Sequence, residues 1–107
     1  MENKKLEMDF MVENLKISLH NNGDCHHNSK LLFEGLKKLG YNVKLIIGFF
    51  TRDDGKTIKH SWVEFEDKIL ETDAEQLHIE SNFAWKIIDD KNIKNRYTKF
   101  SKLSSQN

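Results

Sequence analysis

The chain has 107 residues, which suffice for one domain with its own core, and its 17 Lys and Arg residues balance 17 Asp and Glu residues. A net charge of zero argues against a nucleic-acid-binding protein and against a membrane-surface protein, because both need a basic excess. A single cysteine fits a reducing compartment, and the sequence shows neither a signal-peptide core nor an apolar run long enough for a bilayer. We therefore expect a cytoplasmic protein without nucleic-acid or membrane partners; the lack of proline and the abundance of Lys, Asn and Ile indicate a bacterial or phage origin.

The first expected element is a helix over residues 4–19. Its apolar stripe recurs at helical spacing and comprises Met8, Met11 or Val12, Leu15 and Leu19. The segment "HNNGD" then interrupts the helix with residues that favour turns.

A second helix is expected to begin at Cys25, with Asp24 as its N-cap and Gly40 as the residue that ends it. Its apolar stripe is formed by Leu32, Phe33, Leu36 and Leu39. Gly35 within this helix indicates that another backbone packs closely there, since glycine costs about 1 kcal/mol relative to alanine in a helix.

Strands follow the helices. Residues 43–51 are β-branched and aromatic, "RDDGK" has turn chemistry, and residues 58–66 and 68–73 predict two further strands. Beyond residue 74 the pattern is ambiguous: residues 82–88 suit a strand or a helix, and a last helix is expected to carry Ile93, Tyr97, Phe100 and Leu103. This order predicts an α+β domain over residues 1–103 with a C-terminal tail at 104–107.

The strands around Glu66 and Asp67 form an expected hairpin with a defined register. If these two residues make the turn, paired residues have numbers that sum to 133, so His60 faces Asp73 and Trp62 faces Glu71. A carboxylate opposite a histidine can fix the tautomer of the imidazole. One side of the hairpin is thus polar, while the other side contributes to the core.

Cys25 at the start of a helix fits the same site. The helix dipole stabilises a thiolate, a neighbouring His60 would pair with it, and the backbone N–H of Cys25 can serve as an oxyanion donor. Two other interpretations remain: a buried structural cysteine with an unrelated histidine, and a zinc site made by Cys25, His60 and Asp73. His26 and His27 cannot close around one ion with Cys25, because consecutive helical residues point about 100° apart. We assign no metal ligand and expect no cofactor.

Three segments together resemble a known family. "DCHHNSKLLFEGLKKLGYNVKLIIGF", "HSWVEF" and "KILETD" are similar in order and spacing to the core of transglutaminase-like, papain-like cysteine enzymes, over residues 24–73. Among short members the spacing is similar to that of the leader peptidases that process lasso-peptide precursors, in which a Cys-x-x-x-Ser motif (here Cys25 and Ser29) opens the helix. The resemblance implies a nucleophile helix packed on a small antiparallel sheet, with Cys25 as nucleophile, His60 as general base and acid, and Asp73 as the residue that orients His60.

Two features depart from that family. Asp73 is not followed by proline, so Glu71 could be the third member instead, and no clear glutamine precedes Cys25 to complete an oxyanion hole.

The expected function is a cysteine-dependent amide hydrolase or acyl transferase that acts on a peptide or protein through an acyl-enzyme. The resemblance also implies a separate protein that delivers the substrate. We expect substrate contacts from Trp62, Asn28, Ser29 and His26, although Asn28 and Ser29 could equally tie the helix to its neighbours. The alternatives are a non-catalytic peptide-binding module and a zinc-binding domain that use the same groove.

Overall fold

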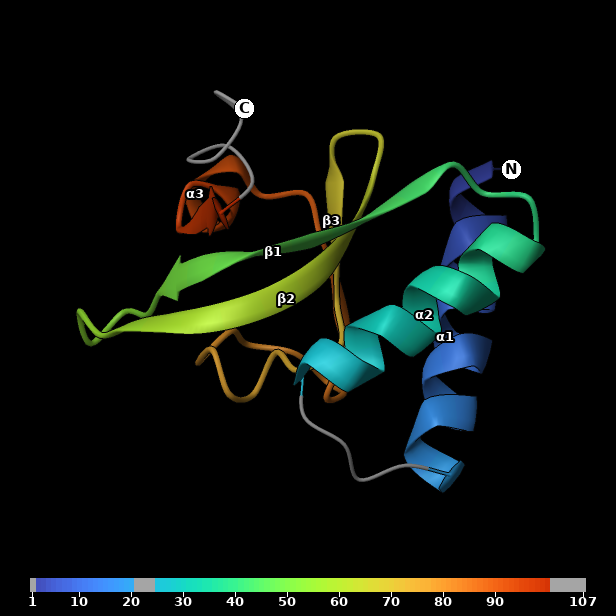
Figure 1. The fold of residues 1–107 in the computed structure, drawn as a ribbon, viewed down its shortest axis with the longest axis horizontal. Helices are drawn as coiled ribbons and strands as arrows, with labels where there is room; N and C mark the ends of the chain where they lie inside the picture. Colours follow the sequence, from blue (N-terminus) through green and yellow to red (C-terminus); the bar gives the residue numbers. More distant parts are fainter. Residues whose placement is uncertain (1, 21–24, 101–107) are drawn as a thin grey trace.

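The computed structural model describes residues 2–20 and 25–100, with side chains described for residues 4–19 and 26–100. The order of elements along the chain (Figure 1) is α1 (Glu2–His20), α2 (Cys25–Lys38), β1 (Val43–Thr51), β2 (Thr57–Phe65), β3 (Lys68–Glu71), β4 (Lys86–Ile88), α3 (Lys91–Lys94) and β5 (Tyr97–Lys99). Two N-terminal helices therefore precede a five-stranded antiparallel sheet, which confirms the predicted α+β class. No helix in the described residues is both long enough and apolar enough to cross a membrane.

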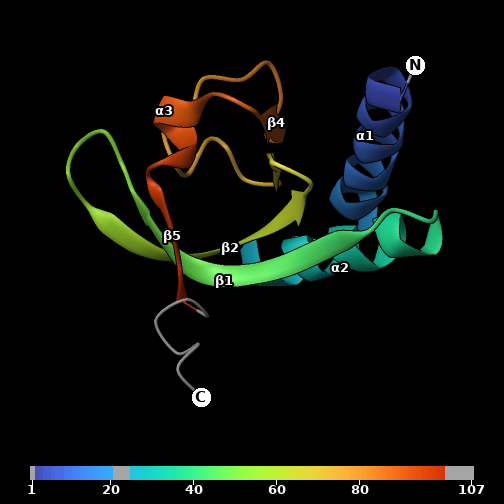
Figure 2. The same cartoon turned by 90° about the horizontal axis from the view of Figure 1, so that it is seen from above.

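The sheet has the strand order β4-β3-β2-β1-β5, and every neighbouring pair is antiparallel. Its centre is the long β1–β2 hairpin, which pairs from Val43↔Phe65 to Thr51↔Thr57. The turn of this hairpin contains Gly55 with a φ of 87°, as its turn chemistry predicts. In Figure 2, α3 and β4 lie on one side of this hairpin, away from α2.

Each face of the sheet has its own apolar cluster, because successive side chains of a strand point to opposite faces. The helices supply Leu6, Phe10, Ile17, Leu32 and Leu36 to the first cluster, where they join Val43, Val63 and Leu70. The second cluster joins strand residues to the segment after β3 and contains Ile46, Phe50, Trp62, Ile69, Ala74, Leu77, Ile79 and Ile88. The sheet is thus covered on both faces.

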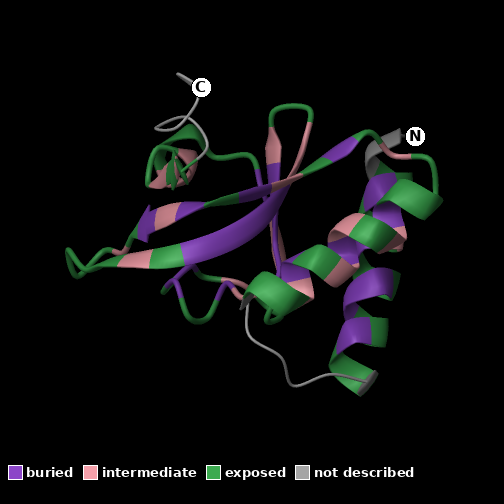
Figure 3. Ribbon diagram, viewed as in Figure 1, coloured by how far each residue is buried: buried purple, intermediate pink, exposed green. Residues whose placement is uncertain are grey.

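The buried side of α1 differs from the predicted one. The expected stripe (Met8, Met11, Val12, Leu15 and Leu19) is exposed, from 41 % at Met11 to 78 % at Leu19. A second set at the same helical spacing is buried instead, namely Leu6, Phe10 and Ile17, together with the polar Glu13 and Asn14. Figure 3 shows the buried side of α1 next to α2 and exposed residues on its other side. The sequence offers two apolar stripes, and only the contact with α2 selects between them.

Helix α2 follows its predicted course. It begins at Cys25, and Gly40 follows its end with a φ of 99°, a left-handed conformation suited to glycine. Leu32 and Leu36 are buried, whereas Leu39 is 47 % exposed and does not belong to the core stripe. The predicted cap, Asp24, lies outside the described residues.

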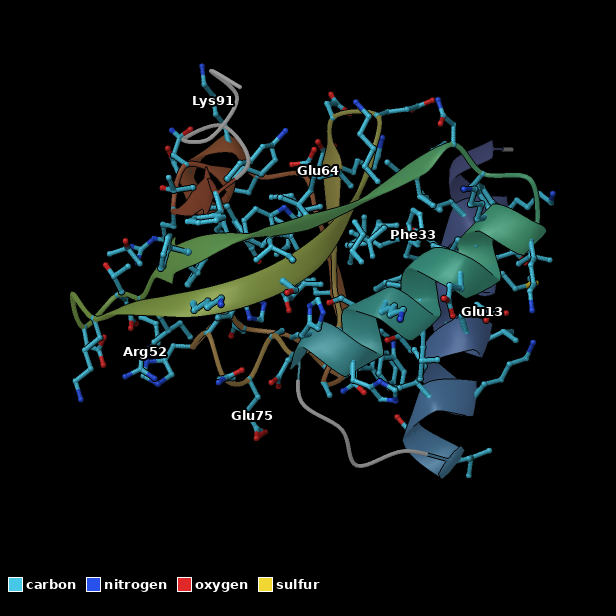
Figure 4. All side chains as sticks on the ribbon, in the orientation of Figure 1. Glu13, Phe33, Arg52, Glu64, Glu75 and Lys91 are labelled. Carbon is cyan, nitrogen blue, oxygen red and sulfur yellow. The ribbon has the colours of Figure 1, made fainter. Side chains whose placement is uncertain are left out.

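The close approach expected at Gly35 is present, but the neighbouring group is a side chain. A Cβ at this position would collide with the Glu13 carboxylate of α1, whereas the sequence predicts another backbone there. Glu13 lies between α1 and α2 (Figure 4).

The C-terminal third corrects the predicted last helix. Ile93 lies in the short α3, whereas Tyr97 lies in β5, which pairs with β1 through Phe50↔Tyr97. Leu103 lies outside the described residues. The ambiguous segment 82–88 ends in a strand, β4. Strand β5 is determined by its pairing with β1, almost fifty residues earlier in the chain. The local pattern of apolar residues does not predict this strand.

Candidate active site

The β2–β3 hairpin has the predicted register. Phe65 pairs with Lys68, Glu64 with Ile69 and Val63 with Leu70, so each pair sums to 133. The turn consists of Glu66 and Asp67, and Glu66 takes a positive φ of 56°, as the tight two-residue turns of hairpins require. This turn therefore places His60, Trp62 and Glu71 on one face of the sheet.

His60 and Glu71 form a fully buried pair at the centre of the site. His60 Nε2 lies 2.7 Å from Glu71 Oε2, and both side chains are 0 % exposed. Glu71 accepts two further hydrogen bonds, from the Asp73 N–H at 2.9 Å to Oε2 and from the Tyr97 hydroxyl at 2.8 Å to Oε1. Three donors thus converge on one carboxylate and satisfy its charge in the interior of the fold.

The carboxylate hydrogen-bonded to His60 is therefore that of Glu71, where the extrapolated register predicts Asp73. The reason is that β3 ends at Glu71, and its pairing with β2 stops at Val63↔Leu70. Beyond that point the Asp73 N–H bonds to the Glu71 side chain, so the chain has left the ladder. Glu71, opposite Trp62 in the register, reaches His60 along the diagonal, which a long side chain can do.

Asp73 is a second carboxylate close to this pair. It is half-buried, and the loss of solvent raises the pKa of its carboxyl group. The negative charge of Glu71 raises this pKa further, while His60 lowers it. Asp73 therefore belongs to the electrostatic environment of His60 without being its hydrogen-bond partner.

The first turn of α2 is fastened to β2 beside His60. His26 Nδ1 lies 2.9 Å from Ser61 Oγ, and the buried Ser29 hydroxyl donates to the Ser61 carbonyl at 2.9 Å. Cys25 directly precedes His26, and Ser61 directly follows His60, so the backbones that carry the two predicted catalytic residues are neighbours. The Cys25 side chain lies outside the described residues, and its predicted distance to His60 stays a prediction.

The residues predicted to contact substrate have different positions. Trp62 is 0 % exposed, stacks against His60 at a ring distance of 6.3 Å, and belongs to the core cluster. It supports His60 from within, and it also lines a pocket together with Glu64 and Tyr97, so its contact with substrate stays a prediction. Ser29 is buried and ties the helix to β2, the structural one of its two predicted roles. His26 is exposed, and Asn28 lines a cavity together with Asp73.

Tyr97 and Ser61 complete the site and were missed by sequence reasoning. Tyr97 packs edge-on against Trp62, with ring centroids 4.8 Å apart, and donates to Glu71. Burial raises the pKa of its hydroxyl far above the usual value, and the Glu71 charge and hydrogen bond add to this shift. The segment "NRYTKF" gives no local signal for this role, because β5 exists only through its pairing with β1.

Within the part of the chain whose side chains are described, no three His, Cys, Asp or Glu residues gather closely enough to hold a metal ion. A zinc site that includes Cys25 involves a side chain outside that part and stays a prediction.

No protein-family model, no curated protein and no solved structure matches this chain.

Proposed function

We propose that this protein is a cysteine-dependent amide hydrolase or acyl transferase of the transglutaminase-like type, acting on a peptide or protein. In this proposal Cys25 is the nucleophile, His60 is the general base and acid, and Glu71 orients His60, with Asp73 beside them. The observation that carries it is the buried His60–Glu71 hydrogen bond of 2.7 Å next to the start of α2. The order of segments along the chain supports the same assignment.

The tautomer follows from the contact with Glu71. A neutral imidazole has one N–H, and the carboxylate 2.7 Å from Nε2 favours that N–H on Nε2. Nδ1 then carries the lone pair and is the nitrogen that exchanges protons with a nucleophile. The Tyr97 hydroxyl and the Asp73 N–H hold the carboxylate in place, so the imidazole is oriented before any substrate binds.

The reaction proceeds in two balanced steps. The Cys25 thiol gives its proton to His60 Nδ1, the sulfur attacks an amide carbonyl, and the backbone N–H of Cys25 stabilises the oxyanion. The imidazolium returns the proton to the leaving amine, and the C–N bond breaks to leave a thioester. Water or a second amine then gives a proton to His60 and attacks the thioester carbonyl. The C–S bond breaks, the acyl group leaves as an acid or as a new amide, and the imidazolium returns the proton to the Cys25 sulfur.

One observation favours a second candidate, a non-catalytic peptide-binding module. The His60 and Glu71 side chains are both 0 % exposed, and buried ion pairs also serve to hold cores in a unique arrangement. In that case the pair would contribute to stability and would leave the thiol of Cys25 with ordinary reactivity.

Thiol alkylation as a function of pH separates these candidates. We expect the wild-type protein to react rapidly with iodoacetamide below pH 7, because the helix start and His60 stabilise the thiolate. His60→Asn should shift the inflection upward, toward the free-cysteine value of about 8.5, because only the helix start then stabilises the thiolate. The matched control is His78→Asn, since His78 also contacts a carboxylate, Asp53 at 3.1 Å, but at an exposed position.

If the alkylation rate of the wild type has its inflection at pH 8 or above and His60→Asn does not change it, the proposal that the protein is an enzyme is wrong. Reaction only after addition of a chelator would instead favour zinc at Cys25. Circular dichroism of both variants establishes that they are folded.

A further inference from the structure

A cavity of about 190 Å³ lies beside the candidate site. Its lining comes from α1, α2 and the segments that flank β3 and β4: Asn14, Ile17, Ser18, Asn28, Thr72, Asp73, Ala84 and Trp85. This volume corresponds to about six water molecules at the liquid value of ~30 Å³ each, and therefore to an extended side chain. Asn28 lies one helical turn after Cys25, so the cavity lies close to the start of α2.

The lining has the chemistry of a cation site. Among the described residues that form its wall, Asp73 is the one charged residue, and none is Lys or Arg. Asn14 uses its amide N–H in a 2.8 Å bond to the Phe10 carbonyl, so its amide oxygen remains as an acceptor. Burial and the Glu71 charge raise the pKa of Asp73, and a bound cation would reverse this shift by stabilising the carboxylate.

Trp85 joins this cavity to a larger groove of about 510 Å³ between α1 and residues 80–87. The apolar part of the groove consists of Phe10, Met11, Phe83, Trp85 and Ile87. Phe83 and Trp85 stack face to face at 5.3 Å, and Phe83 is 53 % exposed, which leaves a large aromatic surface open to a ligand.

The described charged residues of the groove, like that of the cavity, sum to a negative charge. Glu7 and Glu80 line the groove, and the one cation among its described lining residues is Lys86, whose ammonium group donates to the Glu80 carbonyl at 2.7 Å. Groove and cavity thus adjoin at Trp85, and their described lining combines apolar side chains with a net negative charge.

We propose that the groove between α1 and residues 80–87 binds an extended peptide segment of the substrate, and that a Lys or Arg side chain of this segment enters the cavity at Asp73. The proposal rests on the proposed function in that the bound peptide is the substrate of Cys25. An aromatic or aliphatic residue of the same segment packs on the Phe83–Trp85 stack. An acidic peptide is disfavoured, because it would place like charges beside Asp73, Glu7 and Glu80.

The test measures binding alone, on Cys25→Ala protein. Immobilised protein is incubated with a random dodecapeptide library, and the retained peptides are sequenced. We expect Lys and Arg together to be enriched at least threefold at one position, at a fixed distance from an aromatic or aliphatic residue. The charge-neutralising variant Cys25→Ala/Asp73→Asn should lose the basic preference and keep the apolar one.

The matched control is Cys25→Ala/Glu75→Gln. Glu75 is exposed, points outward (Figure 4) and lines neither the groove nor the cavity, so this variant should keep the full preference. A second arm needs no change in the protein: replacing the selected Lys or Arg of the best peptide by norleucine should raise its Kd at least tenfold.

Three results would overturn the inference: no retained peptide, retained peptides without a basic preference, or an equal preference in the Asp73→Asn and Glu75→Gln proteins. Such a result together with rapid, His60-dependent alkylation of Cys25 would leave the proposed enzyme standing. A basic preference with an unreactive thiol would instead identify a peptide-binding module.

Discussion

Glu71 is the residue on which the candidate site depends most. It receives hydrogen bonds from an imidazole, a backbone amide and a phenol, and it has no exposed surface. A buried carboxylate is tolerated only with such a set of donors, because an unpaired charge in the interior costs several kcal/mol. The hydrogen-bond donors that stabilise the buried charge of Glu71 also fix its position relative to His60.

Replacing Glu71 by glutamine tests this role. Glutamine keeps the shape but loses the charge, so the imidazole tautomer is no longer fixed, and we expect turnover of a cleavable peptide to fall by about 10²–10⁴. Asp73→Asn removes the neighbouring charge without touching the 2.7 Å contact and should lower kcat less than tenfold. Steady-state kinetics of both variants, with melting curves, provide the comparison.

The reverse result has a clear meaning. If Asp73→Asn abolishes turnover while Glu71→Gln is nearly silent, Asp73 is the orienting residue in the working enzyme. The contact between His60 and Glu71 then serves the fold alone.

From the buried hydroxyl of Tyr97 we predict how the free energy of unfolding changes at alkaline pH. Its pKa in the folded protein is raised by burial, so the native phenol keeps its proton above pH 10 while the unfolded one loses it. The native state then binds more protons than the unfolded state, and stability falls as pH rises beyond about 10, by about 1.4 kcal/mol per pH unit. Below that pH the contribution of Tyr97 is fully present.

Urea unfolding of the wild type and of Tyr97→Phe at pH 8, 10 and 11 measures this effect. The advantage of the wild type should shrink between pH 10 and 11, whereas a constant difference would contradict a buried phenol. Phenolate absorbance near 295 nm gives an independent check, because the only other tyrosine, Tyr41, has a pKa raised to about 12 by burial and by Asp9. The folded protein should show little phenolate at pH 10.5.

At the scale of elements, the sequence predicts a helix or strand correctly where the contacts that determine it lie close by in the chain. The β2–β3 register followed from a two-residue turn, and the start of α2 at Cys25 followed from the break before it. The buried side of α1 could not be chosen, since both of its stripes are apolar and only the partner helix distinguishes them. The position of Tyr97 was equally inaccessible, because β5 is defined by a distant strand.

Gly48 is where the pairing of β1 with β5 leaves no space for a side chain. A Cβ there would meet the Thr98 carbonyl, and it would lie 2.8 Å from the Trp62 ring and 2.9 Å from the Phe100 nitrogen. Backbone atoms cannot move aside as side chains do, so we expect Gly48→Ala to lower the free energy of unfolding by about 1–3 kcal/mol.

Gly35→Ala is the matched control for this glycine. The atoms that a new Cβ would meet there belong to the tip of the Glu13 side chain, which can rotate away. The gain in helix propensity, about 1 kcal/mol, offsets that movement, and the net change should be close to zero. Equal stability of the two variants in urea would show that β5 is held less tightly than its pairing indicates.

At the scale of the whole molecule, the protein combines a net charge of zero with an exposed apolar surface on α1. The net charge is zero and the isoelectric point is near 7.0. The exposed stripe of α1 includes Met8 and Leu19, at 67 % and 78 % exposure. Molecules without net charge do not repel one another, so this stripe is free to drive association.

Solubility should therefore be lowest near pH 7 and rise on either side of it. The double variant Met8→Lys/Leu19→Lys adds two positive charges and removes apolar surface, and we expect it to be several-fold more soluble at pH 7. Its free energy of unfolding should stay within about 0.5 kcal/mol of the wild type, as for other exposed positions. Leu6→Ala on the opposite, buried side of α1 should cost about 2–5 kcal/mol. If the double lysine variant instead unfolds as readily as Leu6→Ala, the stripe of Met8 and Leu19 is a packed surface and the assignment of the two sides of α1 must be exchanged.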